Sequence, residues 1–576
     1  MTEIKGLPGA AGCVAGTAVV FESRVINTAR ESIADVEAEL AALEGARGRY
    51  GEALVKLADR ARTQHGDEGA AIFEAYQEIL GDDFFFDGVK ELMAAEKACA
   101  AWAIDQKRAE TEAMFLAVDD PYLQARAADI NNVCQELTAE LQGIVTGDPF
   151  TGVEGEALVI FAEDLTPADT VRMDRARLAG MVTERGGVTS HTVILAKALG
   201  IPAIVGAGAM LAKVRTGDGV LVDGALGTVV LGADEAAKAD FMERKAAADV
   251  QKVLFDASKD KSAYSKDGHL TRVNVNSGDK ESIESFNADH CDGVGLFRTE
   301  FLYMGQTDYP SEDFQYEVYR DMAVKAAGKE VIIRTLDIGG DKQLDYMDLP
   351  KEFNPFLGYR AIRLCLDRPE VFKTQLRAIL RSAAHGNVKI MFPMIVNLEE
   401  LLQAKALLEE AKGELRERGA EFKEETPVGI MIETPAAVLL SDQLAKHVSF
   451  FSVGSNDLIQ YTTATDRQNE RVQYLYDSCN LSVIRAIKLT SDNAHAHGVE
   501  IGICGETASE PRLIPLWVAM GIDELSVAPA LVGRTKYIVS QLSKAEQRAT
   551  LDAVLATGSI GEAAALLEQV QRSISL

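Results

Sequence analysis

The amino-acid sequence predicts a multidomain α/β protein, in which an N-terminal α/β domain holds an inserted helical bundle and a C-terminal (β/α)8 TIM barrel follows. Two patterns support this prediction. Residues from about 31 to 146 repeat apolar side chains at helical spacing, whereas short β-rich runs flank them. Further along, eight apolar strand candidates alternate with helix-period segments. The length of 576 residues is also too great for one hydrophobic core.

The N-terminal α/β domain is predicted from two separated segments, residues 1–28 and 147–232. The first segment holds Gly-rich turns and the apolar run TAVVF, which needs partner strands from elsewhere. The second holds the β-rich runs EALVIF, GMVTE, IPAIVG, DGVLVDG and GTVVLG. Because both segments are β-rich, we expect them to share one sheet, which makes the residues between them an insertion.

The insertion, residues 29–146, is predicted to be a bundle of four or five helices with short connections. Helix breaks are expected at Gly66, at Gly81–Asp83 and at Asp119–Pro121. After the α/β domain, residues 233–262 are charged, alanine-rich and helical in period. This segment is predicted to be a helical linker between the two halves of the molecule.

The C-terminal segment, residues 263–576, is predicted to form the barrel. Its strand candidates are TRVNVN, DGVGLF, EVIIRTL, VKIMFP, PVGIMIE, VSFFSVG, GVEIGIC and ELSVAP. A doubly wound open sheet is the alternative arrangement. Eight regular units over roughly 250 residues favour a closed barrel instead.

Composition narrows the possible partners and location. The formal net charge of −29 disfavours nucleic acid and anionic membranes, which both need a basic face. Seven cysteines without a CxxC pair indicate a reducing compartment. The first residues lack the basic segment and the continuous apolar core of a signal peptide. No uncharged apolar run reaches the roughly 18 residues that a membrane-spanning helix needs. We therefore expect a cytoplasmic protein without membrane insertion.

Polar residues follow the predicted barrel strands at the end where barrel active sites lie. They are Arg298, Glu300, Arg334, Asp337, Glu433, Ser455, Asn456, Asp457, Arg467, Cys504 and Glu506. Taken singly, each is more often a structural ion pair at a barrel rim. Together the arginines suit a multiply charged phosphate or carboxylate, because a guanidinium forms bidentate hydrogen bonds. Glu433 and Asp457 offer the oxygen ligands that Mg²⁺ prefers. The set indicates a small phosphorylated carboxylic acid bound with magnesium.

A second candidate site is the stretch GGVTSHTVILAKALG, which places His191 at the start of an apolar helix. A helix-capping role is the ordinary interpretation of such a histidine. A metal site is disfavoured because no further ligands repeat nearby, and a serine hydrolase would need a GxSxG turn. Glycines allow close backbone approach, and a helix N-terminus favours both an anion and a neutral imidazole. The stretch is therefore predicted to make and hold phosphohistidine.

Two words of the sequence, GGVTSHTVILA and FSVGSNDLIQYTTATDR, resemble the signature regions of the phosphoenolpyruvate-utilising phosphotransferases. LFRTEFLYM, RTLDIGGDK, NPFLGYR, MIETPAA and GICGE are further words typical of that family, in the expected order. Within the family, the whole chain is similar to the enzyme I branch of bacterial sugar phosphotransferase systems. The resemblance extends from the first Gly-rich strand to the last barrel strand.

The resemblance implies a role for each candidate residue. His191 would accept the phosphoryl group and Cys504 would be the general acid that protonates the enolate. Glu433 and Asp457 would hold Mg²⁺. The residues implied to bind phosphoenolpyruvate are Arg298, Arg334, Asn456, Asp457, Arg467 and Arg360.

The resemblance also implies partners. The helical insertion would dock the phosphocarrier protein HPr, and the barrel would form a homodimer. The acidic residues Glu68, Glu74, Glu78 and Asp82 offer a landing site for a basic carrier, although a solvated bundle face explains them equally well. Because one imidazole must meet two partners, we expect the 148–231 domain to swing about the linker helix.

Two other functions fit the same fold. A pyruvate phosphate dikinase or phosphoenolpyruvate synthase would need a nucleotide-binding domain, whose place is taken here by about 120 helical residues without a Gly-rich phosphate loop. A catalytically silent scaffold would keep the fold and lose chemical groups. Every group that the chemistry needs is present, so the sequence favours the phosphotransferase.

Overall fold

The structure is a computed structural model that describes residues 2–21, 26–116, 121–144, 148–187, 191–304, 306–340, 344–469 and 471–574. It divides into two compact units, Met1–Asp249 and Val250–Leu576. The division falls within α7 (Glu235–Asp256), the helix that occupies the predicted linker. Each unit is described by itself.

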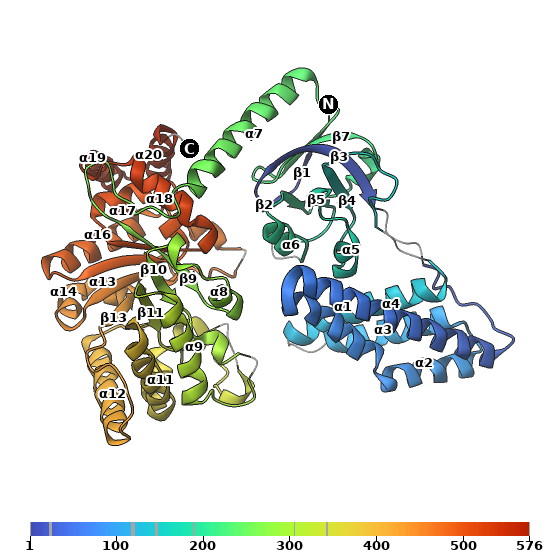
Figure 1. Cartoon of the computed structure of the whole chain (residues 1–576), viewed down its shortest axis with the longest axis horizontal. Helices are drawn as coiled ribbons and strands as arrows, with labels where there is room; N and C mark the ends of the chain where they lie inside the picture. The colour runs from blue at the N-terminus through green and yellow to red at the C-terminus, as the bar shows by residue number, and fades with distance from the viewer. Residues whose placement is uncertain are drawn as a thin grey trace. The chain divides into compact units, whose positions relative to one another are not determined.

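An eight-stranded sheet organises the first unit (Figure 1). Its strands are β1 (Thr2–Lys5), β2 (Leu7–Ala10), β3 (Cys13–Phe21), β4 (Leu158–Ala162), β5 (Leu178–Thr183), β6 (Ala203–Val205), β7 (Gly219–Asp223) and β8 (Thr228–Leu231). Their order across the sheet is β1-β8-β7-β3-β4-β5-β6-β2. β3 pairs with β4 in parallel and with β7 antiparallel, so the segments before and after the helical insertion share one sheet, as the sequence predicts.

Two helices connect the parallel strands of this sheet. α5 (Pro167–Arg172) follows β4, and α6 (His191–Leu199) follows β5. Every residue of β4 is buried, which matches its unbroken apolar sequence LVIFA. A capping box begins α5, because the Thr166 hydroxyl accepts from the backbone of Asp169 while the Asp169 carboxylate accepts from that of Thr166.

The described part of the insertion contains the helices α1 (Val36–Leu80), α2 (Asp83–Glu96), α3 (Ala100–Leu116) and α4 (Pro121–Leu141). α4 packs against both α1 and α3. The predicted break at Gly81–Asp83 separates α1 from α2. The predicted break at Gly66 is wrong, because α1 continues through it. A glycine costs only about 1 kcal/mol in a helix interior, and α1 is anchored by buried residues on both sides, Leu54 and Phe73 among them.

The second unit contains a closed barrel of eight parallel strands. They are β9 (Arg272–Ser277), β10 (Gly293–Phe297), β11 (Glu330–Arg334), β12 (Asn387–Phe392), β13 (Val428–Ile432), β14 (Phe450–Gly454), β15 (Glu500–Cys504) and β16 (Glu524–Val527). Each predicted strand candidate contributes one of them, and β16 pairs with β9 to close the ring. The expected (β/α)8 barrel is confirmed, and the alternative open sheet is excluded.

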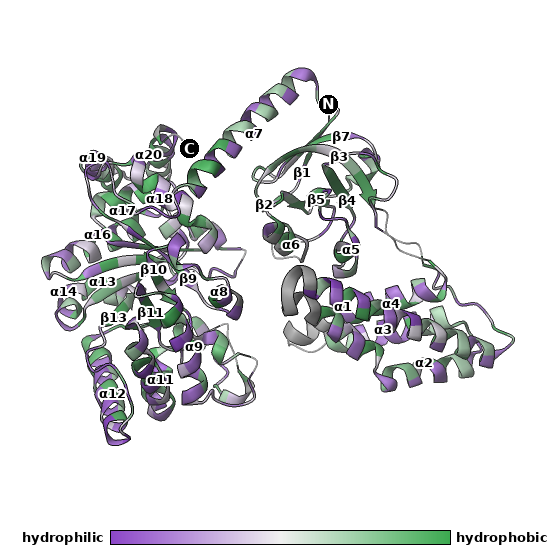
Figure 2. Ribbon diagram, in the orientation of Figure 1, coloured by the Kyte–Doolittle hydropathy of each residue, from purple (hydrophilic) through white to green (hydrophobic). Residues whose placement is uncertain are grey.

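Helices surround the barrel (Figure 1). They are α8 (Lys280–Glu284), α9 (Glu312–Lys325), α10 (Ile362–Asp367), α11 (Pro369–Ser382), α12 (Leu398–Glu417), α13 (Pro435–Leu439), α14 (Ser441–Leu444), α15 (Ser455–Thr463), α16 (Leu481–Ala496), α17 (Ile514–Met520), α18 (Val532–Gln541), α19 (Lys544–Ala556) and α20 (Ile560–Ser573). Hydrophilic residues mark their outer faces in Figure 2, while the strands are mostly hydrophobic. Within the described ranges, no helix is long and apolar enough to cross a membrane.

The barrel interior is layered. A charged layer lies at the N-terminal ends of the strands and consists of Arg272, Glu330, Lys389, Glu500 and Glu524. An apolar layer lies above it and consists of Leu296, Ile332, Met391, Met431, Phe450 and Cys504. The C-terminal strand ends above the apolar layer surround the cavity described next.

Candidate active site

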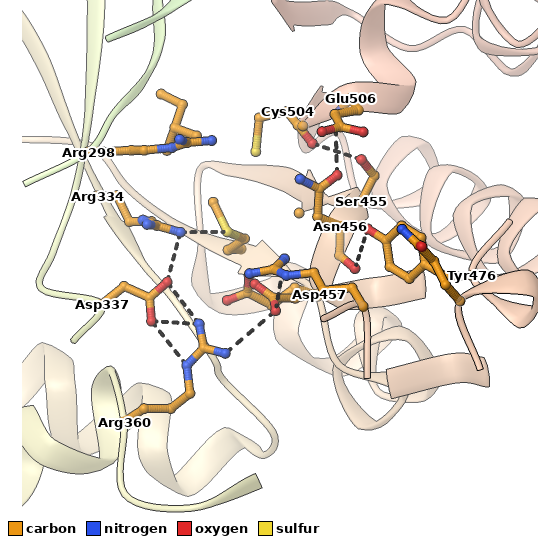
Figure 3. A pocket seen from close by; sticks show the side chains of 17 residues that line it. Arg298, Arg334, Asp337, Arg360, Ser455, Asn456, Asp457, Tyr476, Cys504 and Glu506 are labelled. Atoms are coloured by element: carbon orange, nitrogen blue, oxygen red, sulfur yellow. Dashed lines mark hydrogen bonds and ion pairs between the residues drawn. The ribbon is translucent and has the colours of Figure 1, made fainter. Parts of the chain in front are cut away.

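A cavity of about 470 Å³ opens at the C-terminal ends of the barrel strands (Figure 3). All eight predicted barrel site residues line it: Arg298, Arg334, Arg360, Glu433, Asn456, Asp457, Arg467 and Cys504. They follow different strands, so the closure of the barrel is what brings them together. Figure 3 shows Arg298 and Arg334 on one side of the pocket and Asn456 and Tyr476 on the other, with Cys504 between them at the top of the view.

Ion pairs link the arginines of the pocket to its carboxylates. Arg334 Nη1 lies 2.9 Å from Asp337 Oδ2, and Arg360 Nη2 donates to both oxygens of Asp337 at 2.8 and 3.1 Å. Arg360 Nη1 lies 3.5 Å from Asp457 Oδ1, and Arg467 Nη1 lies 3.7 Å from the same oxygen. Burial alone would lower the pKa of Arg334, but the charges of Glu300 and Asp337 raise it above its ordinary value. These guanidinium groups therefore stay charged and held in place.

Glu433 is a buried carboxyl group at the end of β13. One of its oxygens accepts a hydrogen bond from the backbone N–H of Met394 at 2.6 Å. Burial, together with the charges of Asp457 and Asp337, raises the pKa of Glu433 to about 8, although Arg334 and Arg360 lower it. A Cβ atom at Gly454 would lie 2.8 Å from Glu433 Oε2, so only glycine leaves this carboxylate its space. Glu433 therefore keeps its proton at neutral pH.

Asn456 lies in the first turn of α15, which follows β14 directly. Its side-chain oxygen accepts from the backbone N–H of Glu506 at 3.3 Å, and its backbone carbonyl accepts from the Tyr476 hydroxyl at 3.2 Å. These contacts tie the start of α15 to the segment after β15 and to Tyr476, and they leave the Asn456 amide nitrogen facing the pocket (Figure 3). The segment is thus held from two directions.

Cys504 ends β15, with its side chain buried at the floor of the pocket. The Ser452 hydroxyl donates to its sulfur at 3.3 Å, and the thiol donates to the carbonyl of Val453 at 3.5 Å. Burial raises the pKa of Cys504 to about 11, although the Ser452 hydrogen bond and the Arg334 charge lower it. The thiol consequently carries its proton at neutral pH, as a proton donor must.

The predicted phosphohistidine lies in the first unit, outside the barrel. The backbone of His191 is the first residue of α6, and its side chain lies outside the described residues, together with Val188, Thr189 and Ser190. Gly186, just before them, has φ +97°, a conformation that favours glycine. α6 begins at His191, as expected for a histidine at a helix start, and the role of its side chain stays a prediction.

The chain is similar to known proteins over its whole length. Family models match residues 253–544 as the PEP-binding domain of PEP-utilising enzymes, residues 5–126 as their N-terminal domain and residues 154–227 as their mobile domain. The phosphoenolpyruvate-protein phosphotransferase of Geobacillus stearothermophilus is 40% identical over 573 residues, which cover 100% of this chain and 98% of that protein. The chain belongs to the PEP-utilising enzymes. Its first unit is also similar to an NMR structure of Enzyme I (nEIt), at 31% identity and a TM-score of 0.39, over 43% of this chain and 99% of that one.

A second relative places the chain within a branch of the PEP-utilising enzymes. The phosphoenolpyruvate-protein phosphotransferase of Bacillus subtilis (strain 168) is 39% identical over 569 residues, 99% of this chain and 100% of that protein. This PEP-utilising enzyme is therefore a member of the phosphotransferase branch, as the sequence motifs predict.

Sequence reasoning missed part of the pocket of this PEP-utilising enzyme. Asp337 was identified only as a strand-end residue, although it bridges Arg334 and Arg360. Tyr476 and Gln473 also line the pocket, but they come from an irregular segment without a periodic pattern. Ser452 sits behind the pocket in a strand, where its contact with Cys504 follows from the register of β14 and β15. No sequence pattern distinguishes these residues from their neighbours in the chain.

Proposed function

We propose that this PEP-utilising enzyme transfers the phosphoryl group of phosphoenolpyruvate to its own His191, releases pyruvate, and then passes the group to a histidine of the phosphocarrier protein HPr. This is the first step of sugar uptake by a phosphotransferase system. The observation that carries the proposal is the barrel pocket, where four arginines, four carboxyl groups and a protonated thiol converge. Such a set matches the phosphate, the carboxylate and the enol carbon of a single substrate.

The arginines would bind the substrate. Arg298 is exposed and lines the pocket, and no carboxylate of the described residues forms an ion pair with it, so its guanidinium is available to the phosphate or carboxylate oxygens. Arg334, Arg360 and Arg467 are partly neutralised by Asp337 and Asp457, which positions them before substrate arrives. Asn456 would donate from its amide. Charge from the transferring phosphoryl group would thus be spread over several guanidinium groups.

Glu433 and Asp457 would hold a Mg²⁺ ion. The raised pKa of Glu433 beside Asp457 marks a place where a cation would relieve the repulsion between carboxylates. Within the described part of the chain, no group of three or more His, Cys, Asp or Glu could hold a metal, so substrate and water oxygens would complete the coordination. When bound, the ion would neutralise charge on the phosphoryl oxygens.

Cys504 would deliver the proton that completes pyruvate. The phosphorus–oxygen bond of the enol phosphate breaks as a phosphorus–nitrogen bond forms at His191. The electron pair left on the enolate takes the thiol proton at its methylene carbon, forming a carbon–hydrogen bond, and the thiolate regains a proton from solvent. Burial keeps the thiol protonated for this step.

The second transfer would take place on the first unit. Glu74 and Glu78 lie exposed on α1, whereas Phe73 is buried in the bundle and Asp82 caps α2 by accepting from Phe84 and Phe85. Glu68 has a side chain outside the described residues. Because Glu74 pairs with Arg62, Glu78 is the exposed carboxylate of this edge that best suits a basic carrier such as HPr.

The remaining parts of the proposal concern assembly and location. Two copies would associate as a homodimer through the barrel unit, where Phe353 and Leu357 expose apolar side chains between β11 and α10. A cytoplasmic location fits the seven free cysteines. The 148–231 domain would swing between the barrel and the carrier about α7, in which the boundary of the two units falls.

A carrier-dependent assay tests the proposal. The enzyme, Mg²⁺ and phosphoenolpyruvate are mixed with purified HPr, and phosphorylated HPr is followed by native gel or mass spectrometry alongside pyruvate release. We expect one pyruvate for each phosphorylated HPr, and none when ATP replaces phosphoenolpyruvate. Pyruvate release without phosphorylated carrier, or carrier phosphorylation from ATP, would contradict the proposal.

A further inference from the structure

A second cavity, of about 270 Å³, lies in the first unit, where the helical bundle meets α5. Its lining residues are Tyr50, Ala53, Lys56, Leu57 and Arg60 of α1, Glu136, Ala139 and Glu140 of α4, Ile144 and Arg172. The proposed phosphoryl transfer uses none of them. Apolar side chains and charged groups share its walls, which is typical of a small-molecule site.

Two hydrogen-bond donors at this cavity are buried and unsatisfied. The Tyr50 side chain is only 3% exposed, and its hydroxyl has no hydrogen-bond partner. Arg172 donates from Nη2 to Glu136 at 3.0 Å, but its buried Nη1 has no hydrogen-bond partner and lies 3.8 Å from Asp169. Buried donors nearly always have an acceptor, because a buried donor without a hydrogen bond costs about 1–3 kcal/mol of stability. Two of them at one cavity indicate an acceptor supplied by a ligand.

The mouth of the cavity carries positive charge. Lys56 and Arg60 are exposed and stand one helical turn apart on α1, where i and i+4 side chains share a face. Across the described ranges, neither has an ion-pair partner. The two carboxylates of the lining are already neutralised, Glu136 by Arg172 and Glu140 by Arg49 at 2.6 Å. The unpaired charge of the site is therefore cationic.

We propose that this cavity binds a small organic acid or phosphate ester with two negative charges. Oxygens of one anionic group accept from the Tyr50 hydroxyl and from Nη1 of Arg172 at the buried end. A second negative charge lies between Lys56 and Arg60 at the mouth, and Ala53, Leu57, Ala139 and Ile144 contact the body between them. Because α1 and α4 belong to the helical bundle and α5 to the α/β domain, the bound anion contacts both the bundle and the α/β domain.

Titration calorimetry on the full chain tests the site, with succinate and inorganic phosphate as separate probes. The barrel pocket binds anions too, so the wild type is compared with Tyr50→Phe and with the double variant Lys56→Gln, Arg60→Gln. Tyr264→Phe and Lys252→Gln are matched controls, because Tyr264 and Lys252 are exposed and lie far along the chain. Pyruvate formation from phosphoenolpyruvate checks that each variant is folded and that the barrel is intact.

We expect at least one probe to bind the wild type in a component that Tyr50→Phe and the double variant weaken by roughly tenfold or more. The control variants should retain it. Which probe binds distinguishes a carboxylic acid from a phosphate ester. Identical isotherms for the wild type and the cavity variants would overturn the proposal. So would the absence of saturable binding for both probes, because a water molecule would then satisfy the two donors.

Discussion

At the scale of single residues, the protonation of Cys504 decides whether the pocket can complete pyruvate. Its pKa of about 11 leaves the thiol protonated over the whole physiological range. Replacing it by alanine removes the proton donor and leaves the arginines in place. We expect Cys504→Ala to slow pyruvate formation by roughly 10²–10⁴-fold, the usual contribution of a positioned acid. Pyruvate release in a coupled assay measures this.

The control for that variant is Cys291→Ala, which truncates a buried cysteine of the barrel outside the pocket. It should lose stability but keep its rate, since no reacting atom lies near it. A Cys504→Ala enzyme as fast as the wild type would show that another group supplies the proton.

Ser452 positions the thiol and adjusts its acidity. Its hydroxyl donates to the Cys504 sulfur and stabilises the thiolate, which lowers the thiol pKa. Ser452→Ala should therefore raise the pKa of Cys504 and reduce its thiolate fraction, about tenfold for each pKa unit. We expect alkylation of Cys504 at pH 9, followed by peptide mass spectrometry, to slow several-fold. Ser452→Thr keeps a hydroxyl and should restore the rate; equal rates in the alanine variant would refute this role.

At the scale of elements, α1 illustrates where sequence rules succeed and fail. Its start at Asp35 and its end before the Gly81–Asp83 turn follow capping and turn chemistry. The continuity of α1 through Gly66 could not be predicted in this way, because the low helix propensity of glycine carries no information about the tertiary packing on either side of it. The barrel strands were predictable because most of their residues are buried, so that apolar residues dominate most of the strands.

The interior glycines of α1 give a direct stability prediction. A Cβ atom at Gly48 would meet no atom within 4 Å, and Gly48 lies inside the helix. Gly48→Ala should raise the free energy of unfolding of the first unit by about 0.5–1 kcal/mol, because alanine loses less backbone entropy on folding. Chemical denaturation followed by circular dichroism measures it. Gly413→Ala, at an equally open position of α12, is the counterpart in the barrel unit.

The contrasting variant is Gly454→Ala at the end of β14. Its added methyl group would lie 2.8 Å from Glu433 Oε2 and 2.9 Å from Met431. This change should destabilise the pocket rather than the helix. A stabilising effect there, or a destabilising effect of Gly48→Ala, would contradict the geometry of these two elements.

The candidate site likewise has a part that could be predicted from the sequence and a part that could not. Residues at strand ends could be predicted, because a barrel gathers all of its C-terminal strand ends at one mouth. The contacts among them could not, since Asp337, Tyr476 and Ser452 act through tertiary distances that spacing along the chain does not determine. For the same reason the cavity at Tyr50 has no counterpart in the sequence patterns.

At the scale of the whole molecule, the charged layer at the closed end of the barrel makes stability depend on pH. Burial, together with the charge of Glu330, raises the pKa of Glu524 to about 8. A free glutamate has a pKa near 4.3. Between these values the folded state holds a proton that the unfolded state has released. Stability from this group therefore falls as pH rises, and is lowest above pH 8.

Glu524→Gln removes that titration. Between pH 6 and pH 8, we expect the wild type to lose on the order of 2 kcal/mol more unfolding free energy than the variant. Urea denaturation of the barrel unit at several pH values measures the difference. The comparison cancels contributions from Glu433, which both proteins share. Parallel pH curves for the two proteins would mean that Glu524 is charged in the folded state.

The proposed phosphoryl transfer involves both units, because a phosphoryl group bound in the barrel pocket must reach a histidine at the start of α6. The most direct measurement is the phosphorylation state of His191 after a single turnover with phosphoenolpyruvate and Mg²⁺, read by mass spectrometry under alkaline conditions that preserve phosphohistidine. We predict close to one phosphoryl group on His191 in the wild type and almost none in Arg334→Ala. An unmodified His191 in the wild type, or a label that persists when the pocket is disabled, would contradict the account.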